Sequence, residues 1–373
     1  IDRFATELIM MEGSTWYGGP AGFALATQND APMAAKAHVI GKAFMAVEMK
    51  CARCHDAPFH DVSQRDTFNI AAMLARKDQK IPKTSVVPIV EGARKPEVEI
   101  SLAPGESIKP RWPFDDLTDN HVEDQLLRNA DDERARLAAI ITSPDNERFA
   151  QVIVNRVWAR LLGRGIVEPV DDWELGECSH PELLDWLAHE FVTHGYDLKH
   201  IARLILTSDV YQRRADPEAS APGTTTLFAG PARRRMTGEQ LADSLHVAAG
   251  KAYASEELTM DRDGRQQLRV FLHLGFPRRA WQFVAVANER DRPSLNLPAA
   301  QTVIDLLTAY GWRQQRQEPL TIREEALTPL QPLALAHGAA PARVLDFSDD
   351  SALTELALES LPLDQFVEGM FLR

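Results

Sequence analysis

The chain is short of cysteine, of long apolar runs and of basic charge, and each shortage excludes a class of protein. Three of its 373 residues are cysteines and two of these share one motif, so there is no disulfide framework. No stretch approaches the roughly 20 apolar residues of a membrane-spanning helix. The net charge is −13 and no concentrated basic surface is evident, which argues against binding to a nucleic-acid backbone. We therefore expect no nucleic-acid partner and no transmembrane segment within this chain.

The chain does contain enough apolar material for a large core, with 45% hydrophobic and 25% charged residues. Its length favours two or three domains. The first residues, Ile1-Asp2-Arg3-Phe4, have neither the basic nor the apolar region of a signal peptide and look like the middle of a folded domain. We expect an N-terminal portion to precede them, so the lack of a signal peptide does not bear on location.

Helical periodicity dominates and predicts a mainly α protein, with two helical lobes joined by a short strand-bearing segment. Residues 143–146 are typical of a helix start, and Ser179-His180-Pro181-Glu182 predicts a capping box in which the serine caps the following helix. Helices are predicted over residues 1–12, 32–50, 64–76, 147–162, 181–193, 199–211, 237–249 and 298–310.

The strand-bearing segment interrupts this helical pattern. Residues 86–90 and 98–102 are typical of short strands, and a Pro-Gly turn follows at 104–105. The segment is either a small sheet or an extended linker, and it divides the chain over residues 81–120.

Residues Cys51-Ala52-Arg53-Cys54-His55 carry the Cys-x-x-Cys-His signature of c-type haem attachment. Two thiols must meet the two vinyl groups on one edge of the porphyrin, and the adjacent histidine must fall beneath the iron. Cysteines three apart on a helical turn satisfy both demands. We therefore predict one covalent haem c, with thioethers at Cys51 and Cys54 and with His55 as the proximal iron ligand.

The sequence does not single out a distal ligand for the iron. Met73 lies on the next predicted helix and is the chosen candidate, although methionines at helical spacing are more often core residues. His60 is an alternative ligand, but it follows His55 so closely that it would have to pass around the edge of the macrocycle. Zinc is the alternative cofactor, because thiolates and imidazoles suit a tetrahedral site. Its ligands would be Cys51, Cys54, His55 and His60.

Two parts of the chain resemble planctomycete-type domains. Lys50-Cys-Ala-Arg-Cys-His-Asp-Ala-Pro-Phe59 with Ser63-Gln-Arg-Asp66 resembles the planctomycete-type cytochrome c domain. The residues after 143 resemble the planctomycete-specific domain that accompanies it. The motifs of this second likeness are Ser143-Pro-Asp-Asn146, Val154-Asn-Arg-Val-Trp158, Leu162-Gly-Arg-Gly-Ile-Val-Glu-Pro-Val-Asp-Asp172, Ser179-His-Pro-Glu-Leu-Leu-Asp-Trp-Leu187, Gly195-Tyr-Asp-Leu-Lys199, Ser208 with Tyr211-Gln212, and Arg235-Met236 with Glu239-Gln240.

The resemblance implies a domain organisation and a location. Residues 1–80 would be the C-terminal part of a cytochrome-c-type domain, residues 81–120 the strand-bearing linker, and residues 121–373 the helical companion domain. The family is secreted or located in the cell envelope, so we expect a periplasmic or extracellular protein with other envelope proteins or redox partners in a larger complex. One departure is Ala57, where the family often has a histidine; any role of that histidine is lost or moved to His60.

The predicted function is electron transfer or redox sensing by a c-type cytochrome in an envelope assembly, rather than catalytic turnover. One alternative is a non-redox structural or assembly protein with a zinc-type Cys/His site.

A second alternative is a polysaccharide-related enzyme of unknown mechanism, with the paired carboxylates Asp171 and Asp172 at its site. The two carboxylates belong to a polar cluster that we interpret as a buried Arg–Asp network, because such ion pairs often set geometry rather than chemistry. Asp197, His200 and Ser208 have the residue types of a hydrolase triad, but no Gly-x-Ser-x-Gly elbow accompanies them.

Overall fold

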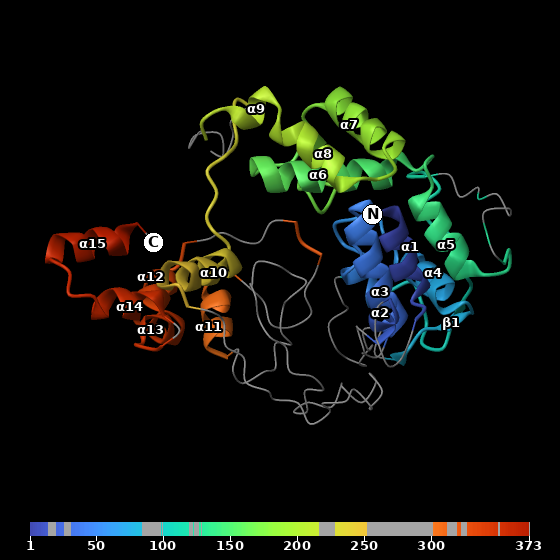
Figure 1. The fold of residues 1–373 in the computed structure, drawn as a ribbon. Helices are drawn as coiled ribbons and strands as arrows, with labels where there is room; N and C mark the ends of the chain where they lie inside the picture. Colours follow the sequence, from blue (N-terminus) through green and yellow to red (C-terminus); the bar gives the residue numbers. More distant parts are fainter. Residues whose placement is uncertain are drawn as a thin grey trace. The chain divides into compact units, whose positions relative to one another are not determined.

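The computed structural model describes residues 1–13, 20–25, 31–83, 98, 100–118, 122, 127, 129–215, 228–251, 301–311, 319–321, 327–349 and 351–372. Of these described residues, 55% are in helices and 4% in strands, which confirms the mainly α class. Figure 1 shows the arrangement of these elements. Unit 1 comprises residues 1–233 with 318–322, and unit 2 comprises residues 234–317 with 323–373. The domain limits expected near residues 80 and 120 stay a prediction. In the described part of the chain, no helix has both the length and the apolar character that crossing a bilayer requires.

The described part of unit 1 contains helices α1 to α9, a π-helical turn η1, a 3₁₀ turn η2 and two short antiparallel strand pairs. The helices are α1 Asp2–Met10, α2 Ala21–Leu25, α3 Pro32–Ile40, α4 Gln64–Ala75, α5 Glu133–Thr142, α6 Glu147–Leu162, α7 Pro181–Thr193, α8 Leu198–Leu206 and α9 Asp209–Gln212. The other elements are η1 Gly41–Met45, η2 Cys51–Arg53, β1 Gln79–Lys80 paired with β2 Ser107–Ile108, and β3 Val167–Glu168 paired with β4 Glu177–Cys178.

Local sequence signals set the ends of the helices that surround the cysteine motif. The side chain of Asn146 caps α6 by accepting a hydrogen bond from the Phe149 N–H, and Gly163 ends this helix with a φ of 86°. A capping box between Ser63 and Asp66 begins α4. Both helices form where the sequence predicts them.

The start of α7 corrects one prediction. The helix begins at Pro181 as expected, but Ser179 does not cap it, and the N-cap residue His180 makes no side-chain capping bond. The Ser179 hydroxyl instead donates to the Ile166 carbonyl at 2.9 Å, and its own N–H donates to the same oxygen at 2.9 Å. This partner lies in the turn before β3, so the serine fixes the β3–β4 hairpin rather than the helix.

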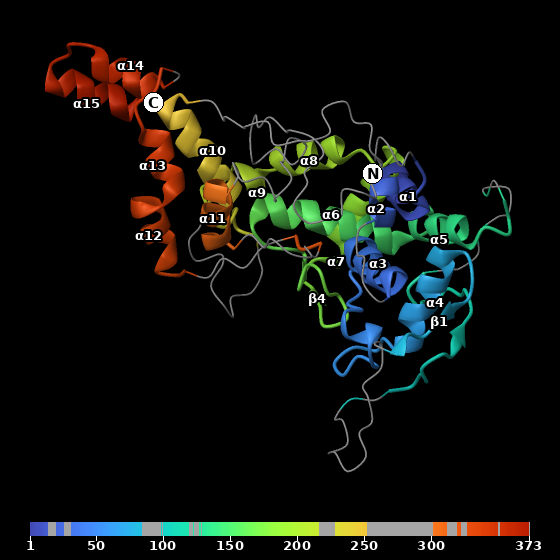
Figure 2. The ribbon, with the colours of Figure 1, turned by 90° about the horizontal axis from the view of Figure 1, so that it is seen from below.

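One large core cluster joins the main helices of unit 1. Helix α3 packs against α4, α1 against α5, and α6 against both α7 and α8 (Figures 1 and 2). The fully buried Phe149 of α6 lies 5.9 Å from the ring of Phe44 in η1 and 5.8 Å from the ring of Tyr196 after α7. Aromatic burial of this kind carries a large share of core energetics. The helices near the cysteine motif and those after residue 133 therefore share one hydrophobic interior.

In its described part, the strand-bearing segment contributes one short strand, β2, which pairs with β1 just before the segment, and Gln79 is opposite Ile108. Ile108 is buried in a small cluster with Phe68 of α4, which holds the pair against that helix. The described residues of the predicted strand 98–102 are not in a strand, and the predicted strand 86–90 lies outside the described residues.

Unit 2 contains a second, smaller group of helices. Its N-terminal helix α10 begins with a capping box between Thr237 and Gln240 and ends at Gly250, whose φ is 60°. Ala242, Leu306 and Ala340 form the buried contact between helices of this unit. Among its described residues, the helices are α10 Gly238–Ala249, α11 Gln301–Ala309, α12 Leu330–His337, α13 Ala339–Leu345, α14 Ala352–Leu358 and α15 Leu363–Phe371.

Candidate functional site

The cysteine motif forms a compact turn whose two thiols are free. The N–H groups of Cys54 and His55 both donate to the carbonyl of Cys51, at 3.1 and 3.3 Å, and these bonds close the 3₁₀ turn η2. Ala52 is fully buried and anchors the turn in the core. Cys51 is exposed and Cys54 is half-buried, so both sulfur atoms remain open to chemical modification.

His55 is held with one ring nitrogen already committed. Its Nδ1 lies 2.7 Å from the backbone carbonyl of Asp56, and because a carbonyl oxygen can only accept, Nδ1 carries the proton. Nε2 therefore keeps its lone pair for a metal. Asp56 is itself fixed, since its Oδ1 accepts from the Gln64 N–H at 2.6 Å and from the Ser101 hydroxyl at 2.9 Å.

A distant segment, residues 171–174, holds the chain on both sides of this turn. Before the turn, the Trp173 N–H donates to the Ala46 carbonyl at 3.0 Å. After it, Nε2 of His60 lies 2.7 Å from Oδ2 of Asp172. The side chain of Glu174 also accepts a hydrogen bond from the backbone N–H of the residue that follows His60. The position of the motif therefore depends on a segment more than a hundred residues away, because His60 and Asp172 are separated by 112.

Two arginines of α6 satisfy carbonyl groups at the end of η1. Nε of Arg148 donates to the Met45 carbonyl at 2.9 Å, and Nη2 of Arg156 donates to the Lys42 carbonyl at 2.5 Å. The last carbonyls of a helix lack partners within it, so these bonds replace the missing ones. The guanidinium of Arg148 also lies 4.4 Å from the ring centroid of Trp173. Burial lowers the pKa of Arg148 to about 10, which reflects how far this cation is withdrawn from water.

Asp171 and Asp172 do not form a paired carboxylate site. Asp171 lies 2.9 Å from Arg156 and accepts from the N–H and hydroxyl of Thr321, at 2.7 and 2.5 Å. Asp172 pairs with His60 instead. Burial lowers the pKa of Arg156, and Asp171 partly offsets this effect. These contacts agree with the interpretation of the cluster as a structural Arg–Asp network.

The family comparison decides what these two segments are. The family PSD1, described as a protein of unknown function (DUF1553), matches residues 133–373. The chain belongs to the PSD1 family. A second family, PSCyt2, described as a protein of unknown function (DUF1549), matches residues 15–79. The chain therefore combines a planctomycete-type cytochrome domain with a PSD1 domain, as the resemblance predicts. Comparisons with curated proteins and with solved structures give no match.

In these terms, the contacts around the motif join the two matched regions. The cysteine turn and η1 belong to the PSCyt2 segment, whereas Arg148, Arg156 and residues 171–174 belong to the PSD1 domain. The PSD1 domain thus contributes the side chains that cap and clamp the PSCyt2 segment. This role could not be predicted from the sequence, because no local pattern links an arginine to a carbonyl a hundred residues earlier.

The two predicted distal ligands occupy different environments. Met73 on α4 is 1% exposed and lies in the main core cluster. His60 would have to give up the contact of its Nε2 with Asp172 in order to bind an iron through that atom. Neither of these environments tests which residue is the distal ligand. Met73 as the ligand and His60 as its alternative both stay predictions.

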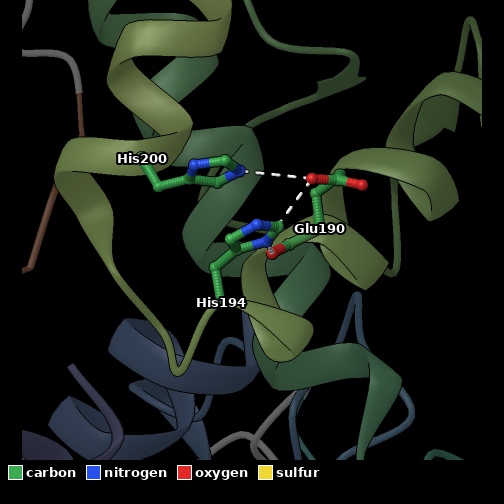
Figure 3. Close-up of side chains that lie close together, drawn as sticks. All are labelled: Glu190, His194 and His200. Atoms are coloured by element: carbon green, nitrogen blue, oxygen red, sulfur yellow. Dashed lines mark hydrogen bonds and ion pairs between the residues drawn. The ribbon is translucent and has the colours of Figure 1, made fainter.

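The sequence-based zinc alternative places the metal at the cysteine motif, but the ligand-type side chains that the structure gathers lie elsewhere. Among the described residues, one group offers three His, Cys, Asp or Glu ligand atoms within 4.8 Å of one another, and it consists of Glu190, His194 and His200 of the PSD1 domain (Figure 3). The sequence signal for it is the Glu–His pair four residues apart at a helix end. His200 could not be predicted as the third member, because it comes close to Glu190 and His194 only through the turn between α7 and α8.

The residue types of a hydrolase triad are not assembled. Asp197 caps α8 by accepting from the Lys199 N–H at 2.8 Å. The Ser208 hydroxyl donates to the Ile205 carbonyl at 2.6 Å, and Ser208 serves as the N-cap of α9. His200 is paired with Glu190. Asp197 and Ser208 therefore have structural roles at the starts of α8 and α9.

Proposed function

We propose that the chain is a c-type cytochrome of a cell-envelope assembly, which transfers electrons or senses redox state through one haem attached at Cys51 and Cys54. The observation that carries this proposal is the Cys51–His55 turn, where two free thiols and an imidazole with an available Nε2 lie together. The PSCyt2 match supports a haem-related redox function in outline. A bound haem would supply the one-electron chemistry.

The residues around the turn fit a haem in three respects. Cys51 and Cys54 are not joined in a disulfide and can form thioethers. The hydrogen bond from His55 to the Asp56 carbonyl fixes the ring and makes Nε2 more basic, as partners of metal-ligating histidines do. The side chain of Phe59 is 77% exposed and offers an apolar surface beside the motif that a macrocycle would cover.

Met73 is our proposed distal ligand, and His60 is the alternative. A buried thioether such as that of Met73 raises the reduction potential of a haem above that of a bis-histidine site. The PSD1 domain would serve as the scaffold that docks the cytochrome segment into its assembly. The acidic chain, with a net charge of −13, suits a basic redox partner or a basic patch on one.

We further propose a periplasmic or extracellular location, which rests on the family resemblance. The test is fractionation of a native host with antibody against the chain. Recovery in the periplasmic, surface or medium fraction supports the proposal, and recovery in the cytoplasm contradicts it.

The haem proposal is tested by the visible spectrum of protein produced in a host that matures c-type cytochromes. We expect sharp α and β bands on reduction and colour that survives acid-acetone extraction. Replacing Cys51 and Cys54 together by serine removes the extraction-resistant colour. Cys178→Ser is the matched control, because this third thiol lies outside the motif and is also free. A colourless protein, or zinc in place of iron in metal analysis, contradicts the proposal.

The distal ligand is tested in the same preparation by Met73→Leu. Loss of a thioether ligand converts a six-coordinate low-spin spectrum into a five-coordinate high-spin one. Met49→Leu is the control, because Met49 is as deeply buried as Met73 and the substitution makes the same change of side chain. An unchanged low-spin spectrum in Met73→Leu, together with a change in His60→Ala, would assign the role to His60.

A further inference from the structure

The end of α7 and the start of α8 form a tightly fixed corner in the PSD1 domain. Gly195 and Tyr196 both have a left-handed backbone, with φ of 65° and 57°. The N–H of Tyr196 donates to the Phe191 carbonyl at 2.8 Å, and its ring packs edge-on against the Phe191 ring at 5.3 Å. Tyr196 is 7% exposed. A buried aromatic anchor therefore holds the turn, and the first residues of α8 return to the last turn of α7 in a defined position.

This corner brings three ligand-type side chains together (Figure 3). Glu190 and His194 lie four residues apart and so face the same side of the last turn of α7. His200 comes from the first turn of α8, and its ring stacks on that of His194 with 3.7 Å between centroids and 14° between planes. Nε2 of His200 and Nδ1 of His194 lie 3.2 and 3.4 Å from the same carboxylate oxygen, Oε2 of Glu190.

These distances match the spacing of ligands around a small transition-metal ion. Zinc bonds to histidine nitrogen and carboxylate oxygen are about 2.0–2.2 Å long, so neighbouring ligand atoms of a tetrahedral site lie about 3.3 Å apart. The two measured nitrogen-to-oxygen separations, 3.2 and 3.4 Å, bracket that value. The ligand set of two imidazoles and one carboxylate is one that zinc and iron(II) both accept.

We propose that Glu190, His194 and His200 form a binding site for a divalent first-row transition-metal ion, with Zn²⁺ as the ion to test. The ion would sit between the two imidazole nitrogens and the Glu190 carboxylate oxygen, which are now held together by one hydrogen bond and one ion pair, and it would replace protons held there. Three protein ligands leave one tetrahedral position for water or an external ligand. The site would also clamp α7 to α8, because two ligands belong to one helix and the third to the other.

The local environment of the three side chains is suited to exchange of an ion with solvent. The side chains of Glu190 and His200 are 25% and 21% exposed, which limits solvent competition, while that of His194 is 47% exposed and leaves an entry path. Nδ1 of His194 also lies 2.8 Å from the Glu190 carbonyl. If His194 binds through Nδ1, this bond must be released; if it binds through Nε2, the bond stays and fixes the ring. Either route requires neutral imidazoles, so acidification is expected to expel the ion.

The test is equilibrium dialysis of the full chain against buffered Zn²⁺, followed by measurement of zinc bound per chain. The wild-type chain is compared with His194→Ala, His200→Ala and the matched control His189→Ala. His189 is an exposed histidine on the same helix and adjacent to Glu190. Because the cysteine thiols are present in all four proteins, their contribution to bound zinc cancels in the comparison.

We expect wild type and His189→Ala each to bind one more zinc ion than His194→Ala or His200→Ala. We also expect Zn²⁺ to raise the melting temperature of wild type and His189→Ala but not that of the two ligand variants. Equal zinc binding and equal thermal shifts in all four proteins would overturn the proposal. Far-UV circular dichroism without metal checks that the variants are folded, and Glu190→Gln gives a third ligand variant that keeps the size of the side chain.

Discussion

At the scale of single residues, Glu48 stabilises the segment that leads into the cysteine turn. Its carboxylate lies 2.5 Å from Nζ of Lys42 and 3.3 Å from Nδ1 of His38, and it accepts from the Lys50 N–H at 2.8 Å. Burial opposes the ionisation of Glu48, but the hydrogen bond from Lys42 and the charge of His38 outweigh it and hold the pKa of Glu48 below its ordinary value. Ionised Glu48 is therefore the form that the folded chain favours.

Glu48→Gln is expected to lower the free energy of unfolding by about 3 kcal/mol, because it removes one member of a buried ion pair. Since the pKa of Glu48 is lowered on folding, its contribution is fully present above its unfolded pKa and is lost as pH falls through the folded value. The difference between variant and wild type should therefore shrink on the acidic side of pH 4.5. Chemical denaturation at several pH values measures this.

The control for that experiment is Glu12→Gln, at an exposed ion pair with Arg76 at 2.9 Å. A pair of this kind contributes about 1 kcal/mol or less. If both substitutions cost the same amount, or if the cost of Glu48→Gln does not depend on pH, the buried network around Glu48 does not have the role assigned to it.

The residues of the motif and those of the further site differ in how far sequence can reveal them. Cys51, Cys54 and His55 lie within five consecutive residues, so their arrangement follows from one local turn and the pattern predicts it. His200 approaches Glu190 only because Gly195 and Tyr196 turn the chain, which is a property of the folded corner rather than of any short pattern. The spacing of residues in the sequence alone therefore does not predict a site whose ligands lie on both sides of a tight turn between helices.

At the scale of elements, helix α6 links the two family segments. Its ends follow from Asn146 and Gly163 and could be predicted from sequence, because capping is decided within a few residues. The contacts of Arg148 and Arg156 could not be predicted in this way, because their partners are carbonyls of η1, about a hundred residues earlier in the chain. The misplaced cap at Ser179 has the same cause, since its bonds to the Ile166 carbonyl hold the serine at the hairpin, and that carbonyl lies outside the local pattern.

Arg148→Met is expected to destabilise unit 1 by about 2 kcal/mol, because it leaves the Met45 carbonyl without its donor in a buried place. It should also raise the rate at which a thiol reagent modifies Cys51 and Cys54, since the segment before them loses its anchor. Arg160→Met is the matched control, because Arg160 lies on the same helix but is exposed. Thiol kinetics and denaturant midpoints that are alike in both variants would show that α6 does not hold the motif in place.

At the scale of the whole molecule, unit 1 includes a short contribution from far along the chain. Residues 318–322 belong to unit 1 although the residues on either side of them belong to unit 2. The buried Thr321 supplies the link, since its hydroxyl donates to Asp171 and accepts from Nη1 of Arg156 at 2.9 Å. The mainly α class could be predicted from periodicity, but this long-range return could not, because a single threonine carries no signal for it.

Thr321→Val keeps the shape of the side chain and removes its hydroxyl. We expect unit 1 to lose about 2 kcal/mol of unfolding free energy, because the lost bond joins a buried carboxylate. Tryptophan fluorescence during urea unfolding is a suitable measurement, and Thr308→Val in α11 of unit 2 is the comparison. An unfolding midpoint of unit 1 that does not change would mean that the residue 318–322 segment does not support it.

The account as a whole depends on a covalent haem at the cysteine turn, and the most direct measurement is mass spectrometry of the proteolytic peptide that contains Cys51 and Cys54. The chain is purified from a host that matures c-type cytochromes and is alkylated before digestion. The account predicts a peptide heavier by one haem, with neither of its cysteines alkylated, while Cys178 is alkylated in the same sample. A peptide of unmodified mass in which both Cys51 and Cys54 carry the alkylating reagent would contradict it.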